Sequence, residues 1–178
     1  MNDIQKLYTE TVAKELESEL GITNIMAVPR VRKIVVNIGV KGAIADKKNL
    51  EVVNGVLEQI TGQKPKVTRA RMSIAGFKLR ENDKVGLMVT LRGKRMYDFL
   101  EKLIAIVLPR IKDFRGVKAG SFDKQGNYTL GLAEYSVFPE VDLAKIDRMY
   151  GMEITMVTNT NKDAAYLLLK KLGMPFQK

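Results

Sequence analysis

The sequence predicts an α+β protein, in which helices cover one side of an antiparallel or mixed sheet. The first observation is that its strand-like segments alternate apolar and polar residues, as strands with one open face do. The second is that helical segments with a single apolar stripe lie between those strands. The segments follow the order helix, strand, helix, strand, loop, strand, helix, loop, strand, strand, helix.

Chain length and composition favour one domain with an ordinary core. The chain has 178 residues, of which 46% are hydrophobic, and domains of this length commonly form a single core. There is no internal repeat, low-complexity tract or interdomain linker. We therefore expect one domain over 1–178, with a long basic loop at about 70–83.

Residues 3–20 are predicted to form the first helix, which Gly21 ends. Residues 1–30 contain five acids against three bases, so the polar face is acidic. Such a face is commonly solvated, but it also suits a surface turned away from a polyanion or toward a basic protein. The apolar stripe recurs at three- and four-residue spacing and comprises Ile4, Leu7, Ala13, Leu16 and Leu20.

A strand and a helix follow. Residues 31–40 alternate, with a β-branched face toward the core and Lys33 and Asn37 on the other face, where they are available to a ligand. Asp46 is placed to cap a helix over 47–61, which Gly62 ends. The predicted core positions of these two elements are Ile34, Val36, Ile38, Val40, Leu50, Val53, Leu57 and Ile60.

The central segment combines two strands with a loop. Residues 66–69 and 85–92 are strand-like, and the aperiodic stretch between them is predicted to be a loop, a kind of segment that is often functional. Phe77, Tyr97 and Phe99 are interpreted as core or loop-packing residues. On the second strand Val85, Leu87, Val89 and Leu91 should face the core, leaving Gly86, Met88, Thr90 and Arg92 on the opposite surface.

The remaining elements complete the pattern. A strongly amphipathic helix is predicted over 95–108, with Pro109 at its end. After a loop over 110–127, strands are predicted at 128–135 and 152–158, with a short helix around 143–149 between them. Asn161 is expected to cap a last helix over 162–172, with Ala165, Leu168, Leu169 and Leu172 inward.

Positive charge is concentrated in one stretch, Gln63–Arg95. It holds ten Lys and Arg residues against Glu81 and Asp83, a net charge of +8 out of +10 for the chain. Clustered cations release counterions from a nucleic-acid backbone, and Gln63, Thr68, Ser73 and Thr90 can hold that backbone in register. We interpret the stretch as an RNA-binding surface; a basic surface that binds nothing is the alternative.

The composition argues against an enzyme. The sequence contains no cysteine and no histidine, which excludes a disulfide, a thiol nucleophile, an imidazole acid–base group and the usual zinc sites. We therefore expect no metal, cofactor or small-molecule substrate. No phosphate-binding loop or RNP1 motif is present, and Gly39–Gly42 matches the GXXG clamp only outside its helical context. No apolar run is long enough to span a membrane, so a cytoplasmic protein is expected.

Several long segments resemble a known family. They are NIMAVPRVRKIVVNIGV, ITGQKPKVTRARMSIAGFKLRE, VTLRGKRMYDFL, LPRIKDFRGV, SFDKQGNYTLGLAEYSVFPEV and LLKKLGMPFQK. In this order, from about residue 4 to the end, they closely resemble bacterial members of the universal 5S rRNA-binding family of large-subunit ribosomal proteins, family five. The resemblance implies a five-stranded, mainly antiparallel sheet packed against helices, related to the RNP fold.

The same resemblance implies a structural role in translation. It predicts a ribosome-bound protein that attaches 5S rRNA to the central protuberance beside companion 5S rRNA-binding proteins. It also predicts contacts with the long large-subunit rRNA and with P-site tRNA, and a bridge to head protein thirteen of the small subunit.

The family's RNA-recognition residues match Asn37 in VVN, Gln63 in TGQKP and Thr90 in VTLRG. The whole predicted 5S rRNA site is Lys33, Asn37, Gln63, Lys64, Lys66, Thr68, Arg69, Thr90 and Arg92. The predicted P-site tRNA loop is Arg71, Met72, Ser73, Ile74, Ala75, Gly76, Phe77, Lys78, Leu79 and Arg80. The predicted intersubunit bridge is Arg110, Lys112 and Arg115. The alternative from the charge alone is an RNA-annealing or anionic-surface protein acting away from the ribosome.

Overall fold

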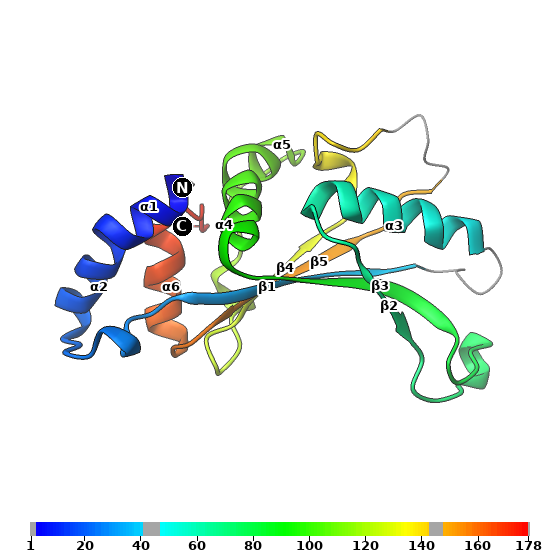
Figure 1. The fold of residues 1–178 in the computed structure, drawn as a ribbon, viewed down its shortest axis with the longest axis horizontal. Coiled ribbons are helices and arrows are strands. Elements are labelled where there is room, and N and C mark those ends of the chain that lie inside the picture. The colour runs from blue at the N-terminus through cyan, green and yellow to red at the C-terminus, as the bar shows by residue number, and fades with distance from the viewer. Residues whose placement is uncertain (1–2, 41–46, 143–147, 178) are drawn as a thin grey trace. The chain divides into compact units, whose positions relative to one another are not determined.

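The computed structural model describes residues 3–40, 47–142 and 148–177. Its fold is α+β: one five-stranded antiparallel sheet in the order β2-β3-β1-β5-β4, with helices packed on one side (Figure 1). The fold class and the number of strands are therefore as predicted. The strands are β1 Val31–Gly39, β2 Lys66–Arg69, β3 Lys84–Leu91, β4 Tyr128–Leu132 and β5 Met152–Thr158.

The helices agree with the predicted segments and differ in detail. The first comprises α1 Asp3–Leu7 and α2 Ala13–Leu20, joined by the π-helical turn Tyr8–Val12. The others are α3 Lys47–Thr61, α4 Gly93–Lys102, α5 Leu108–Arg110 and α6 Lys162–Lys171, and the π-helical segment Leu103–Val107 joins α4 to α5. Short 3₁₀ turns lie at Ile25–Ala27, Ala75–Phe77, Ala119–Ser121 and Tyr135–Val137.

The chain divides into two compact units. The first unit comprises Met1–Val35, Leu91–Leu130 and Ile154–Lys178, and the second comprises Val36–Thr90 and Gly131–Glu153. Strands β1, β3, β4 and β5 each contribute residues to both units, so the single-domain organisation stays a prediction.

In the second unit, α3 and the inner faces of β1 and β3 form the core. Every predicted core position of α3 is buried, and on β1 and β3 Ile38, Leu87 and Val89 are at most 2% exposed. Gly86 departs from the prediction, because it is buried rather than part of the open surface. A Cβ atom at Gly86 would lie 2.5 Å from the carbonyl oxygen of Ile38, so only glycine fits between these neighbouring strands.

In the first unit, the N-terminal helix turns a different stripe inward than predicted. Leu7 and Leu20, two members of the predicted apolar stripe, are 40% and 36% exposed and do not belong to the buried face. The π-helical turn takes more residues per turn than an α-helix, which places every fourth residue on the inner face. That face consists of Ile4, Val12 and Leu16, which are buried, and Tyr8, which is half-buried.

The acidic face of that helix is partly neutralised within the unit. Lys171 on α6 donates hydrogen bonds to the carboxylates of Glu15 (2.7 Å) and Glu19 (2.8 Å). These bonds, the one to Glu15 first, raise the pKa of Lys171. Part of the face thus binds α2 to α6.

Further predicted elements are confirmed or shifted at their ends. Asn161 accepts a hydrogen bond from the amide of Ala164 (3.1 Å) and so caps α6 as expected. The strand β4 ends at Leu132, three residues early, and a 3₁₀ turn at Tyr135–Val137 follows. The predicted cap Asp46, and residues 143–147 of the predicted short helix, lie outside the described residues. Within the described part of the chain, no helix has the length and hydropathy to cross a bilayer.

Candidate nucleic-acid interface

The open face of β2 and β3 presents polar residues in register. The two strands pair antiparallel, with Lys66 opposite Met88 and Thr68 opposite Gly86. Directly opposed residues share one face of a sheet, and Thr90 lies on that face two residues beyond Met88. Lys66 is exposed, while Thr68, Met88 and Thr90 are half-buried. Thr90 therefore lies on the predicted face of the strand and is half-buried there.

Gln63 reaches the same part of the second unit from the end of α3. Gly62 adopts a left-handed conformation (φ 64°) that ends the helix. The hydroxyl of Thr61 donates to the carbonyl oxygens of Leu57 (2.7 Å) and Gln63 (3.1 Å), which fixes the turn. The Nε2 atom of Gln63 then donates to the main-chain carbonyl of Thr90 (3.3 Å). Two predicted site residues far apart in sequence are thereby brought together.

Asn37 lies on β1, which is the neighbour of β3 in the sheet. Its side chain is half-buried, on the face opposite the buried Val36 and Ile38. The Nδ2 atom of Asn37 donates to Oε2 of Glu153 at 3.4 Å. Sequence reasoning did not single out Glu153, although the alternation of 152–158 already placed it on the solvent-facing side of its strand. An RNA backbone approaching Asn37 would therefore meet one carboxylate.

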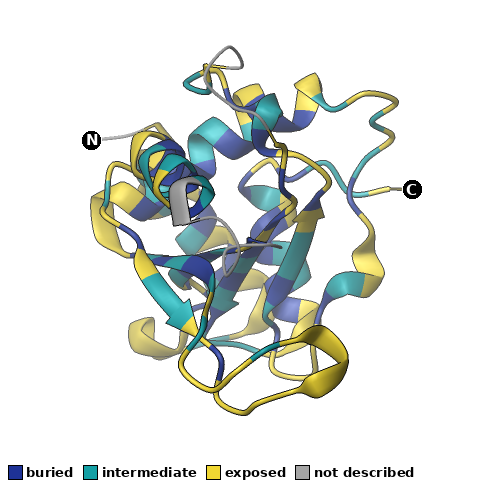
Figure 2. Cartoon of the chain, turned by 90° about the vertical axis from the view of Figure 1, so that its right-hand side faces the viewer, coloured by how far each residue is buried: buried dark blue, intermediate teal, exposed yellow. Residues whose placement is uncertain are grey.

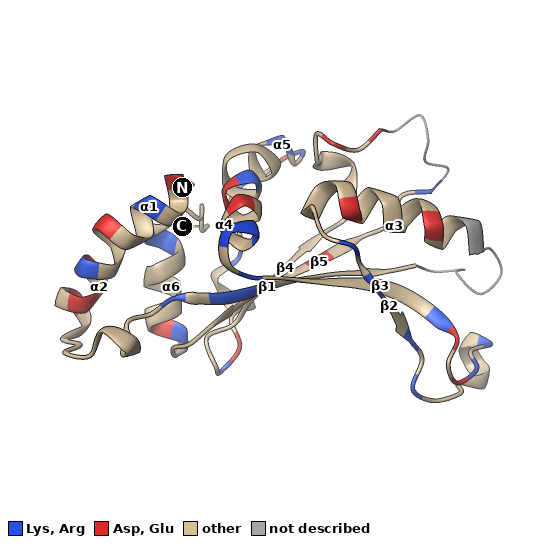
Figure 3. Cartoon of the chain, in the orientation of Figure 1, with Lys and Arg blue, Asp and Glu red and all other residues tan. Residues whose placement is uncertain are grey.

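All ten cations of Gln63–Arg95 are exposed, and Figure 3 marks Lys and Arg positions along the backbone. Among the described residues, none of the ten forms an ion pair with a carboxylate. Their charges are thus uncompensated by carboxylates there, the condition under which binding a polyanion releases counterions. Lys64, Lys66, Arg69, Arg71, Lys78, Arg80 and Lys84 belong to the second unit, and Arg92, Lys94 and Arg95 to the first. Lys33, also in the first unit, is half-buried on β1.

The long loop over 70–83 is hydrogen-bonded to itself. Ile74 and Leu79 exchange main-chain hydrogen bonds of 2.9 and 3.1 Å around the 3₁₀ turn Ala75–Phe77, and Lys78 closes that turn at φ 51°. At the base of the loop, the amide of Ala70 donates to the carbonyl of Asp83 (2.9 Å). The loop predicted from aperiodicity is therefore a small hairpin with a defined backbone.

Polar side chains support this hairpin. The carboxylate of Asp83 accepts from the amide of Arg80 (2.7 Å), and the hydroxyl of Ser73 accepts from the amide of Glu81 (3.0 Å). One of the two acids in Gln63–Arg95 thus has a structural partner in the backbone.

The end of the hairpin is exposed (Figure 2), and several of its residues are apolar. Phe77 is 79% exposed and Met72 71% exposed, with Ile74 beside them in sequence at 43%. The interpretation of Phe77 as a packing residue was wrong, because its ring lies on the outside of the hairpin. The other two aromatic residues do pack, since Phe99 is buried and Tyr97 is half-buried. Exposed apolar groups flanked by Arg71, Lys78 and Arg80 are typical of an interaction surface.

The three predicted bridge residues lie in the first unit, where Arg110 ends α5 and Lys112 and Arg115 follow it. Arg110, Lys112 and Arg115 are all exposed. The segment they belong to is tied to the C-terminal residues, because the amide of Val117 donates to the carbonyl of Pro175 (2.8 Å). The structure thus shows an exposed basic segment here.

An α+β sheet with an open polar face and a projecting basic hairpin defines a protein suited to binding a nucleic-acid backbone. Two family models match the chain: one described as ribosomal protein L5 over 24–80, and one described as the C-terminus of the same ribosomal protein family over 84–176. The chain belongs to the ribosomal protein L5 family.

Curated relatives agree over almost the whole length. The chain is 52% identical to the large ribosomal subunit protein uL5 of Mesoplasma florum, over 98% of each chain. It is 50% identical to the protein of the same name from Psychrobacter cryohalolentis, over 99% of this chain and 100% of the relative. The corresponding protein of Chloroflexus aurantiacus is 52% identical, over 98% of this chain and 97% of the relative.

Proposed function

We propose that this protein is a structural, non-enzymatic constituent of the large ribosomal subunit that binds 5S rRNA and attaches it to the central protuberance. The observation that supports this most is the group of Asn37, Gln63 and Thr90 in the second unit, where Gln63 and Thr90 are joined by a hydrogen bond. Hydroxyl and amide groups at fixed positions hold an RNA backbone in one register, and the exposed cations around them supply affinity.

The hairpin over 70–83 is proposed to contact P-site tRNA. Its hydrogen-bonded backbone holds Arg71, Lys78 and Arg80 beside the exposed ring of Phe77. Cations suit the tRNA phosphates, and an exposed aromatic ring suits an accessible base.

Further contacts are proposed on the basis of the resemblance to the family. Exposed Arg110, Lys112 and Arg115 are proposed to bridge to head protein thirteen of the small subunit. The long rRNA of the large subunit and the companion 5S rRNA-binding proteins are proposed as its other partners, in the cytoplasm.

Filter binding to 5S rRNA at stepped salt concentrations tests the proposal. We expect affinity for 5S rRNA to exceed that for an unrelated tRNA and to fall steeply with salt. Equal affinity for both RNAs, or a flat salt response, would contradict it. Sucrose-gradient fractionation of a lysate adds a second check: a pool mostly away from the large subunit would favour an RNA-annealing protein instead.

A further inference from the structure

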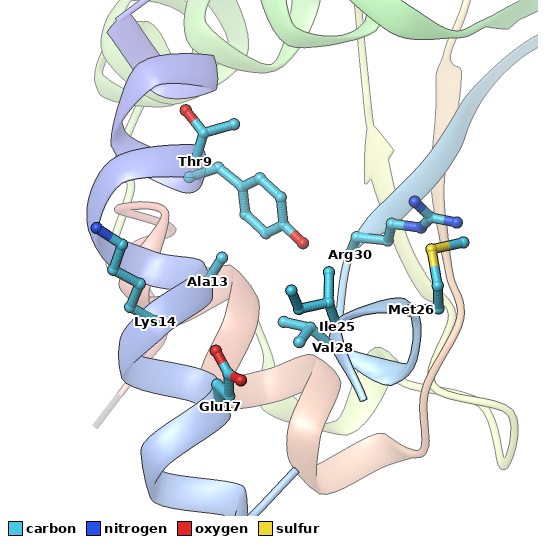
Figure 4. Close-up of a pocket in the computed structure, with 9 residues that line it drawn as sticks. Thr9, Ala13, Lys14, Glu17, Ile25, Met26, Val28 and Arg30 are labelled. Atoms are coloured by element: carbon cyan, nitrogen blue, oxygen red, sulfur yellow. The ribbon is translucent and has the colours of Figure 1, made fainter. Parts of the chain in front are cut away.

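The first unit contains a groove that none of the proposed contacts uses. It has a volume of about 380 Å³ and lies between the N-terminal helix and the segment that leads into β1 (Figure 4). Lys14 and Glu17 line it from the helix, and Ile25, Val28 and Arg30 from the following segment. A volume of this size lies within the ~300–1,000 Å³ range of small-molecule sites.

The walls of the groove are rigidly held. The hydroxyl of Tyr8 donates to the carbonyl of Pro29 (3.0 Å). Asn159 bonds the same segment twice, since its Oδ1 accepts from the amide of Arg30 (2.7 Å) and its Nδ2 donates to the carbonyl of Val28 (3.1 Å). The main chain beside Arg30 is thus fixed before any ligand arrives, which lowers the entropy cost of binding.

The groove combines aromatic, cationic and apolar groups. Because the hydroxyl of Tyr8 is already hydrogen-bonded to Pro29, the aromatic ring is the part of Tyr8 that can contact a ligand. The centroid of this ring lies 6.4 Å from that of Tyr97. Burial raises the pKa of both phenols above the usual value, and the positive charge of nearby Arg30 offsets only part of this increase. Arg30 is exposed, and among the described residues its guanidinium forms no hydrogen bond or ion pair.

Two further side chains at the groove are unusually exposed for apolar residues. Ile25 is 76% and Met26 66% exposed, and both line the groove. Their turn is ordered by Asn24, whose side chain accepts from the amide of Met26 (2.9 Å). An ordered apolar edge beside an unpaired guanidinium suits a ligand with a flat apolar face and an anionic end.

We infer that this groove holds a single unpaired nucleotide of an RNA chain, with the base against Tyr8, Ile25 and Val28 and its phosphate at Arg30. Unstacked bases bind aromatic rings and guanidinium planes in this way. The carboxylate of Glu17 is an acceptor only, so it suits the N–H groups on the edge of a base. A purine stacks more strongly on an aromatic ring than uracil does, so the groove should prefer adenine.

The inference is tested on the purified full-length protein with adenosine 5′-monophosphate as the probe, followed by amide NMR shifts. We expect shifts at Ala13, Ile25 and Val28, weaker shifts with uridine 5′-monophosphate, and none at these positions with inorganic phosphate. Arg30→Gln should weaken binding on the order of tenfold. Lys124→Gln, which removes an exposed cation of the same unit away from the groove, should leave it unchanged.

Equal shifts with inorganic phosphate, or unchanged affinity in Arg30→Gln at unchanged Tm, would overturn the inference. Shifts elsewhere in the chain but none at the groove would do the same. Because the probe is a free nucleotide, this result is independent of 5S rRNA binding, and the two proposals can fail separately.

Ultraviolet cross-linking in assembled large subunits then identifies which RNA supplies the nucleotide in the groove. A cross-link at Tyr8 to 5S rRNA or to the long rRNA supports the inference and names the RNA. Cross-links of rRNA to this protein at other residues, with none at Tyr8, would count against it. A cross-link of Tyr8 to another ribosomal protein would show that an apolar side chain fills the groove instead.

Discussion

The side-chain amide of Gln63 donates a hydrogen bond to the main-chain carbonyl of Thr90 across 3.3 Å. The bond connects the turn after α3 to the end of β3, and it leaves the hydroxyl of Thr90 and the Oε1 atom of Gln63 without a hydrogen-bond partner among the described residues. Both residues are half-buried, so these two polar groups remain partly accessible to a ligand.

Removing either side chain should weaken 5S rRNA binding without unfolding the protein. We expect Gln63→Ala and Thr90→Ala each to cost roughly 1–3 kcal/mol of binding free energy, measured by filter binding at fixed salt. Gln59→Ala, an exposed glutamine on α3, is the matched control and should bind like the parent. Parental affinity in both site variants, at parental Tm, would show that these residues do not contact 5S rRNA.

The cations around this pair should act through phosphates. Lys66 is exposed beside Thr68 on β2, so Lys66→Gln is expected to weaken binding to all RNAs to a similar degree. The slope of log K against log salt should fall by about 1, because one fewer counterion is released. A loss confined to 5S rRNA, with the slope unchanged, would instead indicate a base contact.

Phe77 should matter for binding and not for folding. Because its ring is 79% exposed, Phe77→Ala should change the free energy of unfolding by no more than about 0.5 kcal/mol, while reducing tRNA retention in the P site. Phe99→Ala, at a position 2% exposed, is the contrasting variant and should cost about 3–5 kcal/mol of stability. A large drop in Tm for Phe77→Ala would mean that the ring packs against the protein.

Two glycines on neighbouring strands should respond differently to alanine. At Gly86 the new Cβ atom would lie 2.5 Å from the carbonyl oxygen of Ile38, whereas at Gly39 nothing lies within 4 Å. Gly86→Ala should therefore destabilise the protein by about 1–3 kcal/mol in denaturant melts, and Gly39→Ala by much less. Equal effects would contradict the close approach of β1 and β3.

The raised pKa of the Tyr128 phenol predicts how the stability of the protein changes at alkaline pH. The Tyr128 side chain is 1% exposed and its hydroxyl donates to the carbonyl of Lys118 (3.0 Å), and burial raises its pKa from 10.0 to about 12. Because this pKa is higher in the folded than in the unfolded state, the contribution of Tyr128 to the free energy of unfolding is full below pH 10. That contribution is lost as the pH rises toward 12.

The parent should accordingly lose roughly 1–3 kcal/mol more than Tyr128→Phe between pH 10 and pH 12, measured by denaturant melts across that range. The phenylalanine variant keeps the ring and removes only the titrating hydroxyl. Parallel stability curves for the two proteins would show that Tyr128 ionises at its ordinary pKa.

Local sequence patterns determined most of the secondary structure. Alternation placed Ile38 inside and Asn37 outside, and the capping preference of Asn161 placed the start of α6, because both depend on side chains within a few residues. The concentration of charge in Gln63–Arg95 is likewise a property of the sequence alone.

The tertiary structure decided what depends on distant residues. The π-helical turn places residues other than Leu7 and Leu20 on the buried face of the first helix. Gly86 is buried because the main chain of the neighbouring strand β1 lies against it. The hydrogen bond from Gln63 to Thr90, the carboxylate of Glu153 beside Asn37, and the groove at Arg30 all join segments separated in sequence. Periodicity describes one element at a time; a site assembled from several elements exists only once they pack.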